Sequence, residues 1–207
     1  SISLAPLGLL LGFWVGFGAI AELIDRAGFG RMAIGLSFRR LAGLPRTAFS
    51  TALAHFGLGV TVIGIVTASA WQLELVTTMQ PGTSTPLGNY TVTFDGSANR
   101  TGENYMAEIG HFTIMSPDGS KRQLAPERRV YPASGTPTTE AAIETYGFSQ
   151  LYLQLGEQGS DGSHVVRAWY KPFVTLIWLG CIVMAAAGVL SLSDRRLRVG
   201  APRPAAK

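Results

Sequence analysis

Three long apolar runs dominate the pattern of hydrophobic and polar positions along the chain. The first extends from Leu4 to Ile24, the second from about Thr47 to Ala70, and the third from Phe173 to Leu192. A helix of about 20 apolar residues spans the hydrocarbon core of a bilayer, because each residue adds about 1.5 Å to its length. The pattern therefore predicts three transmembrane helices.

Between the second and third runs the period of the pattern changes to two. Apolar and polar residues alternate in the stretches 90–94, 151–155 and 165–170, and Asp118-Gly119 lies where a hairpin turn is expected. This region predicts a small antiparallel β-domain of about six or seven strands. The segment 138–146 is predicted to form a short helix or a turn between strands.

The predicted fold class is a membrane protein, α-helical with three transmembrane helices plus a small extracytoplasmic antiparallel β-domain. The expected domains are residues 1–70 with two spans (about 4–24 and 47–70), residues 71–172 with the β-domain, and residues 173–207 with the third span and a basic tail.

Arginines beside the apolar runs predict the topology. The connector 25–46 carries five arginines and one aspartate, and a second Arg-rich segment follows the third run. Short Arg-rich loops face the cytoplasm. We therefore expect residues 25–46 and the C-terminus inside, and the N-terminus and residues 71–172 outside. Within the connector, the stretch 29–41 is predicted to be an amphipathic interfacial helix.

The composition agrees with a membrane protein and excludes several functions. Only 14% of the residues are charged, whereas soluble domains have about 25%. The net charge of +4 comes mostly from arginines next to the apolar runs, which suits membrane topology better than nucleic-acid binding. The single cysteine, Cys181, excludes thiol–disulfide catalysis by this chain alone. The first run has no basic segment before it, so a signal peptide is not favoured.

The first run carries two features that concern neighbouring helices. Gly8, Gly12 and Gly16 recur at every fourth position, and such a ridge of small residues lets another helix approach closely. Glu22 lies four residues before Arg26, and we expect an interfacial ion pair between them. A buried polar contact with a partner helix is the alternative.

His55 is the one ionisable residue in the interior of the second run. It lies eight residues after Thr47, which is about 12 Å along a helix and within the inner leaflet. An imidazole in hydrocarbon needs a polar partner. Position alone leaves two roles open, a hydrogen bond between helices or a ligand to a cofactor. Ala48, Ala52 and Gly59 share or border its face, so that a second helix or a flat ligand would fit there.

The other candidate residues have ordinary interpretations. His111 and His164 are expected to be surface or edge-strand residues, since neither lies at metal-ligand spacing from cysteines or acids. Arg128 and Arg129 beside Tyr131 would suit an acidic or propionate group, but a solvated strand surface is favoured. The sequence has no nucleophile–base pair, P-loop, GxGxxG or HExxH motif. No catalytic residue is assigned.

Several segments together resemble the C-terminal part of the CcmF-type haem lyase of the bacterial cytochrome c maturation system. They cover nearly the whole chain in order and read LPRTAFSTALAHFGLGVTVIG, NYTVTFDG, TGENYMAE, APERRVYP, TPTTEAAI, LYLQLGE and YKPFVTLIWLGCIVMAAAGVLSLSDRR. The resemblance implies a C-terminal fragment, or a separately encoded subunit, of a multi-pass protein of the bacterial inner membrane. It places the predicted β-domain in the periplasm.

The resemblance also implies a chemistry. Members form thioether bonds between haem vinyl groups and the cysteines of apocytochrome c. They also hold a b-type haem in the membrane on two histidines, and this haem is thought to reduce the incoming substrate haem. His55, in ALAHFGLGVT, matches the second of these histidines. The resemblance thus implies that His55 is an axial ligand of the iron of haem b, with the other axial ligand supplied from outside this chain.

The partners implied by the resemblance are the remaining N-terminal part of the lyase, a periplasmic haem chaperone, and apocytochrome c with its presenting subunits. The lipid bilayer is a further partner, and nucleic acid is not expected. The chain alone is not expected to be active. The alternative hypothesis is a non-catalytic membrane scaffold whose β-domain docks partner proteins.

Overall fold

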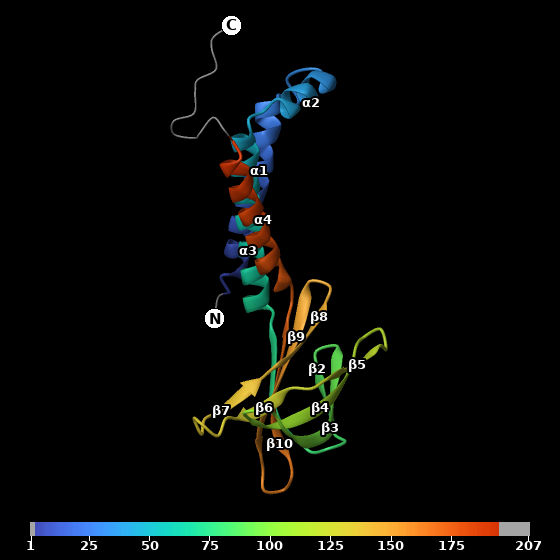
Figure 1. Cartoon of the computed structure of the whole chain (residues 1–207). Coiled ribbons are helices and arrows are strands. Elements are labelled where there is room, and N and C mark those ends of the chain that lie inside the picture. Colours follow the sequence, from blue (N-terminus) through green and yellow to red (C-terminus); the bar gives the residue numbers. More distant parts are fainter. Residues whose placement is uncertain (1–2, 195–207) are drawn as a thin grey trace. The chain divides into compact units, whose positions relative to one another are not determined.

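The structure is a computed structural model that describes residues 3–194. The chain divides into two compact units (Figure 1). The helical unit contains the residues up to Ala70 together with those from Val174, and the β-unit extends from Trp71 to Phe173. The basic tail predicted after the third span lies outside the described residues. Each unit is described by itself.

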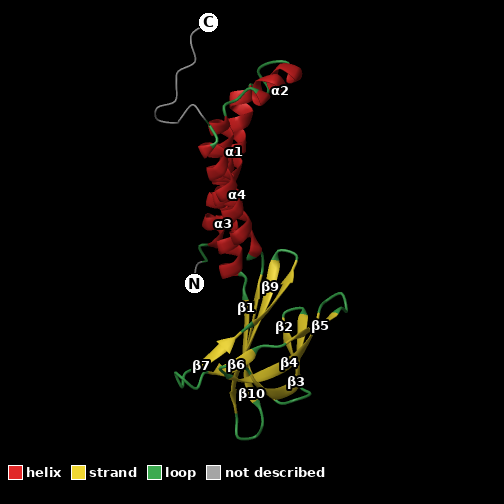
Figure 2. Cartoon of the chain, viewed as in Figure 1, coloured by secondary structure: helices red, strands yellow, loops and turns green. Residues whose placement is uncertain are grey.

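The described residues of the helical unit form three long helices and one short helix, drawn in red in Figure 2. They are α1 (Ala5–Ala27), α2 (Ile34–Ala42), α3 (Arg46–Ala70) and α4 (Thr175–Leu192). Within residues 3–194, the three long helices have the length and hydropathy needed to cross a membrane. Pro45 immediately precedes α3, where a proline sacrifices no hydrogen bond of the helix.

Glycines allow α3 to pack closely against both of its neighbours. A Cβ atom at Gly59 would lie 2.7 Å from the carbonyl oxygen of Gly12 and 2.8 Å from the backbone nitrogen of Gly16, so α1 and α3 touch through their backbones. A Cβ atom at Gly57 would lie 2.8 Å from the carbonyl oxygen of Gly180 in α4. The glycines of α1 thus form the close helix contact that their spacing predicts.

The connector between α1 and α3 begins with two ion pairs. Arg26 Nη2 donates to Glu22 Oε1 at 2.5 Å, which is the predicted interfacial pair, and Arg31 Nη2 donates to Asp25 Oδ1 at 2.6 Å. The helix expected at 29–41 is present as α2 and starts five residues later than expected, at Ile34.

The β-unit is a sandwich of two antiparallel sheets. One sheet has the strand order β1-β10-β9-β8, and the other has the order β2-β3-β4-β6-β7, with β5 also paired to β4. The strands are β1 (Leu73–Met79), β2 (Ser84–Leu87), β3 (Tyr90–Thr101), β4 (Met106–Met115), β5 (Lys121–Leu124), β6 (Glu127–Val130), β7 (Pro137–Glu140), β8 (Ala142–Tyr146), β9 (Ser149–Gln158) and β10 (His164–Lys171). The described residues therefore contain ten strands, and the prediction of six or seven was wrong.

The short strands account for this error. The segment 138–146, predicted as a short helix or a turn, forms most of β7 and all of β8. Its alanines and glutamates favour a helix in isolation, but β7 pairs with β6 and β8 pairs with β9. Strand formation here depends on pairing partners rather than on local preference. The hairpin expected at Asp118-Gly119 joins β4 to β5, and Gly119 has the positive φ of 82° that favours glycine in such a turn.

The core of the β-unit lies between the two sheets. The alternating leucines of β9 and the residues Val166 and Ala168 of β10 are fully buried. From the opposite sheet, Phe94 and Phe112 pack with ring centroids 4.8 Å apart. The three apolar helices and this antiparallel sandwich agree with the predicted fold class.

Candidate functional site

His55 lies on a side of α3 that the other described helices leave open. Its side chain is exposed within the described chain. Its Nδ1 atom lies 2.8 Å from the carbonyl oxygen of Thr51, one turn earlier in the same helix. A carbonyl oxygen only accepts hydrogen bonds, so Nδ1 carries the ring proton. In the neutral ring this leaves the lone pair on Nε2, which is the form of imidazole that binds a metal.

The packing of α3 fixes the direction of this imidazole. Gly59 faces α1 and Gly57 faces α4, and a turn of the helix about its axis would bring larger side chains into both contacts. His55 lies beside the side of α3 that meets α1, four residues before Gly59, and its side chain is nevertheless exposed within the described chain. Its only hydrogen bond goes to its own helix, so the described part of the chain contains no helix-to-helix hydrogen bond through this residue.

The small residues near His55 do not form the open surface that the sequence suggested. Ala48, Ala52 and Gly59 are buried, and Gly59 is covered by the backbone of α1. The expectation of a second helix on this face is met by α1, but α1 does not cover the imidazole. At Gly59 the backbone of α1 takes the place that a flat ligand would need, whereas Ala52 lines an open groove between the helices. The open face is the one that carries Thr51 and His55.

The two histidines of the β-unit differ from each other. His111 is exposed, as expected. The surface or edge-strand role expected for His164 was wrong, since its side chain is 1% exposed and its strand lies between β1 and β9. His164 Nε2 lies 2.6 Å from Glu108 Oε1. The Ser97 hydroxyl donates to the same oxygen at 3.0 Å, and the ring of Phe94 packs against the imidazole.

The alternation of the sequence contained a signal for this buried histidine. His164 lies an even number of residues from Val166 and Ala168, both of which face the core. In a regular strand, residues two apart share a face, so the imidazole is placed inside. A buried imidazole then requires a polar partner. The sequence offers no means of choosing Glu108 as this partner, because 56 residues separate the two.

The arginines near Tyr131 form ion pairs within the β-unit. Arg129 Nε donates to Glu127 Oε2 at 2.8 Å, and its guanidinium lies 4.6 Å from the ring centroid of Tyr105. The hydrogen bond with Glu127 raises the pKa of Arg129 above its ordinary value. Arg128 Nη2 lies 3.3 Å from Glu157 Oε1. These contacts agree with a strand surface of paired charges.

Residues 3–194 contain no metal site formed by protein side chains alone. No group of three or more His, Cys, Asp or Glu side chains there is arranged to hold a metal ion. A haem iron needs only axial ligands from the protein, since the porphyrin supplies the other four donors. The Nε2 atom of His55, whose Nδ1 is held by the Thr51 carbonyl, fits one such ligand.

The chain is similar to a known protein family and to several of its members. The family described as CcmF C-terminal beta-sandwich matches residues 70–172. A "Cytochrome c-type biogenesis protein CycK" of Rhizobium meliloti (strain 1021) is 50% identical over 99% of this chain and 30% of its own length. The "Cytochrome c-type biogenesis protein CcmF" of Escherichia coli (strain K12) is 32% identical over 95% of this chain and 29% of its own length.

A solved structure, "Cytochrome c Heme Lyase CcmF", shares the fold with a TM-score of 0.64 at 17% identity, over 93% of this chain and 35% of that chain. The chain spans about 30% of the length of the curated relatives that it matches. The chain belongs to the CcmF family and corresponds to the C-terminal part of its members.

Proposed function

We propose that this chain is the C-terminal part of a haem lyase that attaches haem covalently to apocytochrome c in the periplasm. In this role it contributes His55 as one axial ligand of a b-type haem in the membrane. The names of the relatives, cytochrome c-type biogenesis proteins, and of the solved structure, a cytochrome c haem lyase, support this class of activity. The bond formed would be a thioether between a haem vinyl group and a cysteine of the apocytochrome.

The observation that carries the proposal is the state of His55. The Thr51 carbonyl holds Nδ1 at 2.8 Å and leaves Nε2 as the free nitrogen. The glycine contacts hold α3 against both neighbouring helices, and the His55 side chain stays exposed within the described chain. Haem bound there would supply one-electron transfer to the incoming haem. The chain's own residues fix the tautomer and the direction of the ligand, and the second axial ligand comes from outside this chain.

The proposed location is the bacterial inner membrane. The arginines of residues 25–46 favour the cytoplasmic side for the connector, which places the β-unit in the periplasm. This orientation brings the β-unit to the side where apocytochrome c and a periplasmic haem chaperone would be met. The proposed partners are these two proteins, the subunits that present the apocytochrome, and the N-terminal part of the lyase.

The ligand role is tested by replacing His55 with glycine in the complete membrane assembly. We expect loss of the b-type band in the reduced-minus-oxidised visible spectrum, together with loss of cytochrome c yield. Exogenous imidazole should restore the band, because it can enter the space of the missing ring and bind the iron. A matched control is His111→Gly, which removes an exposed histidine of the β-unit and should leave the spectrum unchanged. A b-type band that survives in His55→Gly without imidazole would contradict the ligand role.

A second candidate function is a scaffold whose β-unit docks partner proteins. It is favoured by the outer face of the sheet that contains β9 and β10. There Val76 and Ile143 are 55% and 52% exposed, and the rings of Tyr152 and Trp169 meet edge to face at 5.5 Å. The strand pairing aligns Ile143 with Tyr152 and Tyr152 with Trp169. An aromatic row with exposed aliphatic neighbours is typical of a protein-binding surface.

This scaffold role is tested by the substitution Ile143→Lys, which places a charge on the outer face without entering the core. Capture of the haem chaperone and of apocytochrome c by the assembly should fall, while the b-type band stays. A matched control is Thr139→Lys on β7, which is exposed in the other sheet. Unchanged capture by Ile143→Lys would remove the support for docking at this face.

A further inference from the structure

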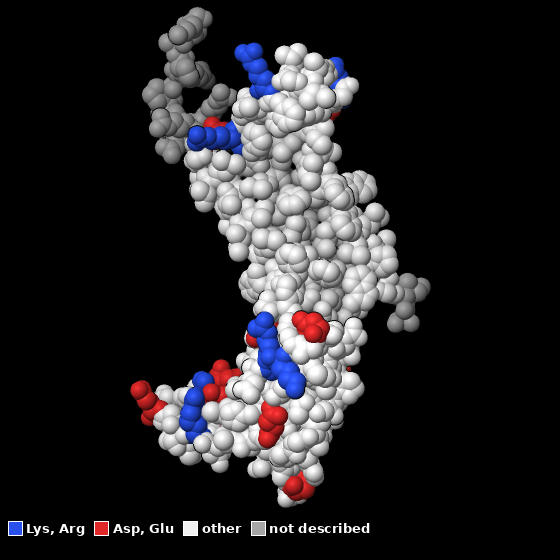
Figure 3. All heavy atoms as spheres, turned by 90° about the vertical axis from the view of Figure 1, so that its right-hand side faces the viewer, with Lys and Arg blue, Asp and Glu red and all other residues white. Residues whose placement is uncertain are grey.

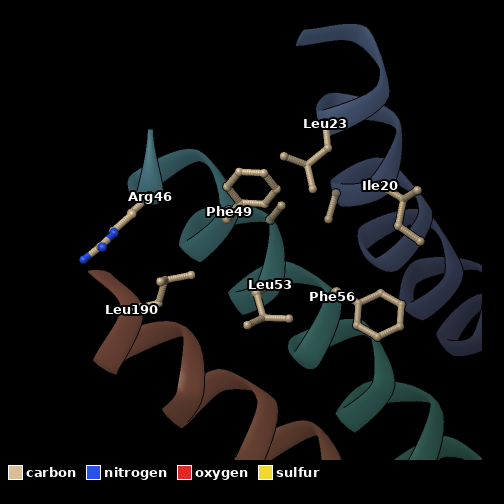
Figure 4. Close-up of a pocket in the computed structure, with 9 residues that line it drawn as sticks. Ile20, Leu23, Arg46, Phe49, Leu53, Phe56 and Leu190 are labelled. Atoms are coloured by element: carbon tan, nitrogen blue, oxygen red, sulfur yellow. The ribbon is translucent and has the colours of Figure 1, made fainter. Parts of the chain in front are cut away.

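A groove opens in the helical unit between α1, α3 and α4, at the end where α3 begins (Figure 4). Its volume is about 500 Å³. Among its lining residues one is charged, Arg46. The others have hydrocarbon side chains and are Ala19, Ile20, Leu23, Phe49, Ala52, Leu53, Phe56 and Leu190. The groove is therefore an apolar slot with a cation at one end.

The guanidinium of Arg46 is held at the end of α4 by hydrogen bonds to Ser193. Its Nη1 atom donates to the carbonyl oxygen and to the hydroxyl oxygen of Ser193, at 3.2 Å each. Both acceptors are uncharged, and they hold the side chain at the end of α4. The nearby carboxylate of Asp194 accepts the backbone N–H of Thr47 at 3.3 Å, which helps to cap the start of α3.

The charges of the helical unit gather at the same end as this groove. In Figure 3 the sides of the long helices show no charged side chains, and basic residues lie near α2 and the adjacent helix ends. The segment 28–46 contains four arginines, of which Arg31 is paired with Asp25. Each arginine near an anionic membrane surface contributes about 1 kcal/mol of attraction. Charge complementarity thus favours an anionic partner at the end of the groove that Arg46 marks.

The shape of the groove favours a flexible chain over a helix. Transmembrane helices approach one another through small residues, and the glycines of α3 are used against α1 and α4. The groove is instead walled by branched and aromatic side chains such as Phe49 and Leu53, which leave a narrow apolar slot. An acyl chain is apolar and adapts to such walls.

We propose that an anionic glycerophospholipid of the cytoplasmic leaflet occupies this groove, with an acyl chain between α1 and α4 and its phosphate on Arg46. The leaflet follows from the orientation proposed above, whereas the binding itself depends only on the groove and the cation. Basic pockets between transmembrane helices bind anionic headgroups in this way. The lipid would fill the space beside α3 on a different face from His55.

The headgroup contact is tested by native mass spectrometry of the complete assembly, after exchange into detergent with equal amounts of phosphatidylglycerol and phosphatidylcholine. The wild type should retain phosphatidylglycerol in preference. Arg46→Gln should retain about five-fold less, equivalent to the ~1 kcal/mol attraction of one arginine. Arg40→Gln makes the same charge change on α2, outside the groove, and should retain more phosphatidylglycerol than Arg46→Gln. Equal loss in both variants, or equal retention of both lipids by the wild type, would overturn the proposal.

A photo-crosslinking measurement identifies the occupant directly and does not depend on the stability of the arginine variant. Benzoylphenylalanine at Ile20, a groove residue that is 40% exposed, should form an adduct with the mass of an anionic phospholipid. The same group at Ile182, which is 65% exposed and outside the groove, should label lipids without regard to headgroup. A crosslink from Ile20 to another protein segment would show that a helix fills the groove and would refute the lipid assignment.

Discussion

The pair of Glu108 and His164 offers a quantitative test of the β-unit. His164 is 1% exposed, and Glu108 is 19% exposed. Their contact of 2.6 Å joins Nε2 to Oε1, and the second ring nitrogen, Nδ1, is buried without a partner in the structure. The substitution Glu108→Ala removes the only hydrogen-bond acceptor that Nε2 has. Both ring nitrogens of a buried imidazole would then lack a protein partner.

The expected loss of stability follows from the number of ring nitrogens of His164 that lack a partner. A buried polar group that loses its partner costs about 1–3 kcal/mol, and removal of Glu108 leaves the buried imidazole of His164 in this state. We therefore expect Glu108→Ala to lower the free energy of unfolding of the β-unit by about 2 kcal/mol. The double variant Glu108→Ala with His164→Leu should recover most of this loss, because replacing both partners by apolar groups is often nearly neutral.

Hydrogen–deuterium exchange of the β9 and β10 amides in the complete assembly measures the effect where it arises. A loss of 2 kcal/mol speeds exchange by about 30-fold when exchange follows the opening equilibrium. The control is Glu157→Ala, which breaks a 3.3 Å pair whose carboxylate is 82% exposed, and should cost about 0–1 kcal/mol. The reasoning fails if Glu157→Ala is as costly as Glu108→Ala. It also fails if the double variant is less stable than the single one.

Three further predictions concern other parts of the chain. Gly59→Ala should destabilise the helical unit by about 1–3 kcal/mol, because the new Cβ would lie 2.7 Å from the backbone of α1. Thermal unfolding in detergent measures this loss. The control is Gly188→Ala, where no atom lies within 4 Å of the new Cβ. Leu153→Ala in the sandwich core should cost about 2–5 kcal/mol in the same β9 exchange measurement, since Leu153 is 0% exposed. Hydrogen bonds from the Ser120 hydroxyl and N–H lower the pKa of Asp118 in the folded protein. These hydrogen bonds therefore stabilise the fold at a pH above the Asp118 pKa of the unfolded chain. The stabilisation is lost as the pH falls through the Asp118 pKa of the folded protein. Ser120→Ala should therefore raise the Asp118 pKa toward its ordinary value, as an NMR titration of its carboxyl carbon would show.

The sequence predicts those features that depend on local pattern. Length and hydropathy are sufficient for the three spans, and alternation is sufficient for the long strands of the sandwich. The Asp118-Gly119 turn follows from residues that tolerate positive φ. The short strands β7 and β8 could not be predicted in this way, since their residues acquire extended structure only through β6 and β9.

The candidate site shows the same division between local and distant information. The sequence places His55 inside a span, and its carbonyl partner at Thr51 lies one helical turn away and is local. Whether Gly59 faces a ligand or a helix depends on how α1 packs against α3. The sequence of neither helix alone shows this packing. The His164 contact with Glu108 likewise depends on how β10 and β4 meet across the sandwich.

The glycines of α3 influence His55 by preventing rotation of the helix about its axis, and not by contact with a ligand. Gly57 and Gly59 are held against two different neighbours at backbone distance, and a helix pinned on two faces cannot turn about its axis without a clash on one of them. His55 is therefore directed outward before any ligand arrives, with its tautomer fixed by Thr51. Such preorganisation lowers the conformational cost of binding. Under the proposed ligand role, substitution of either glycine should therefore weaken the b-type band of the assembly, even though neither residue lies on the open face.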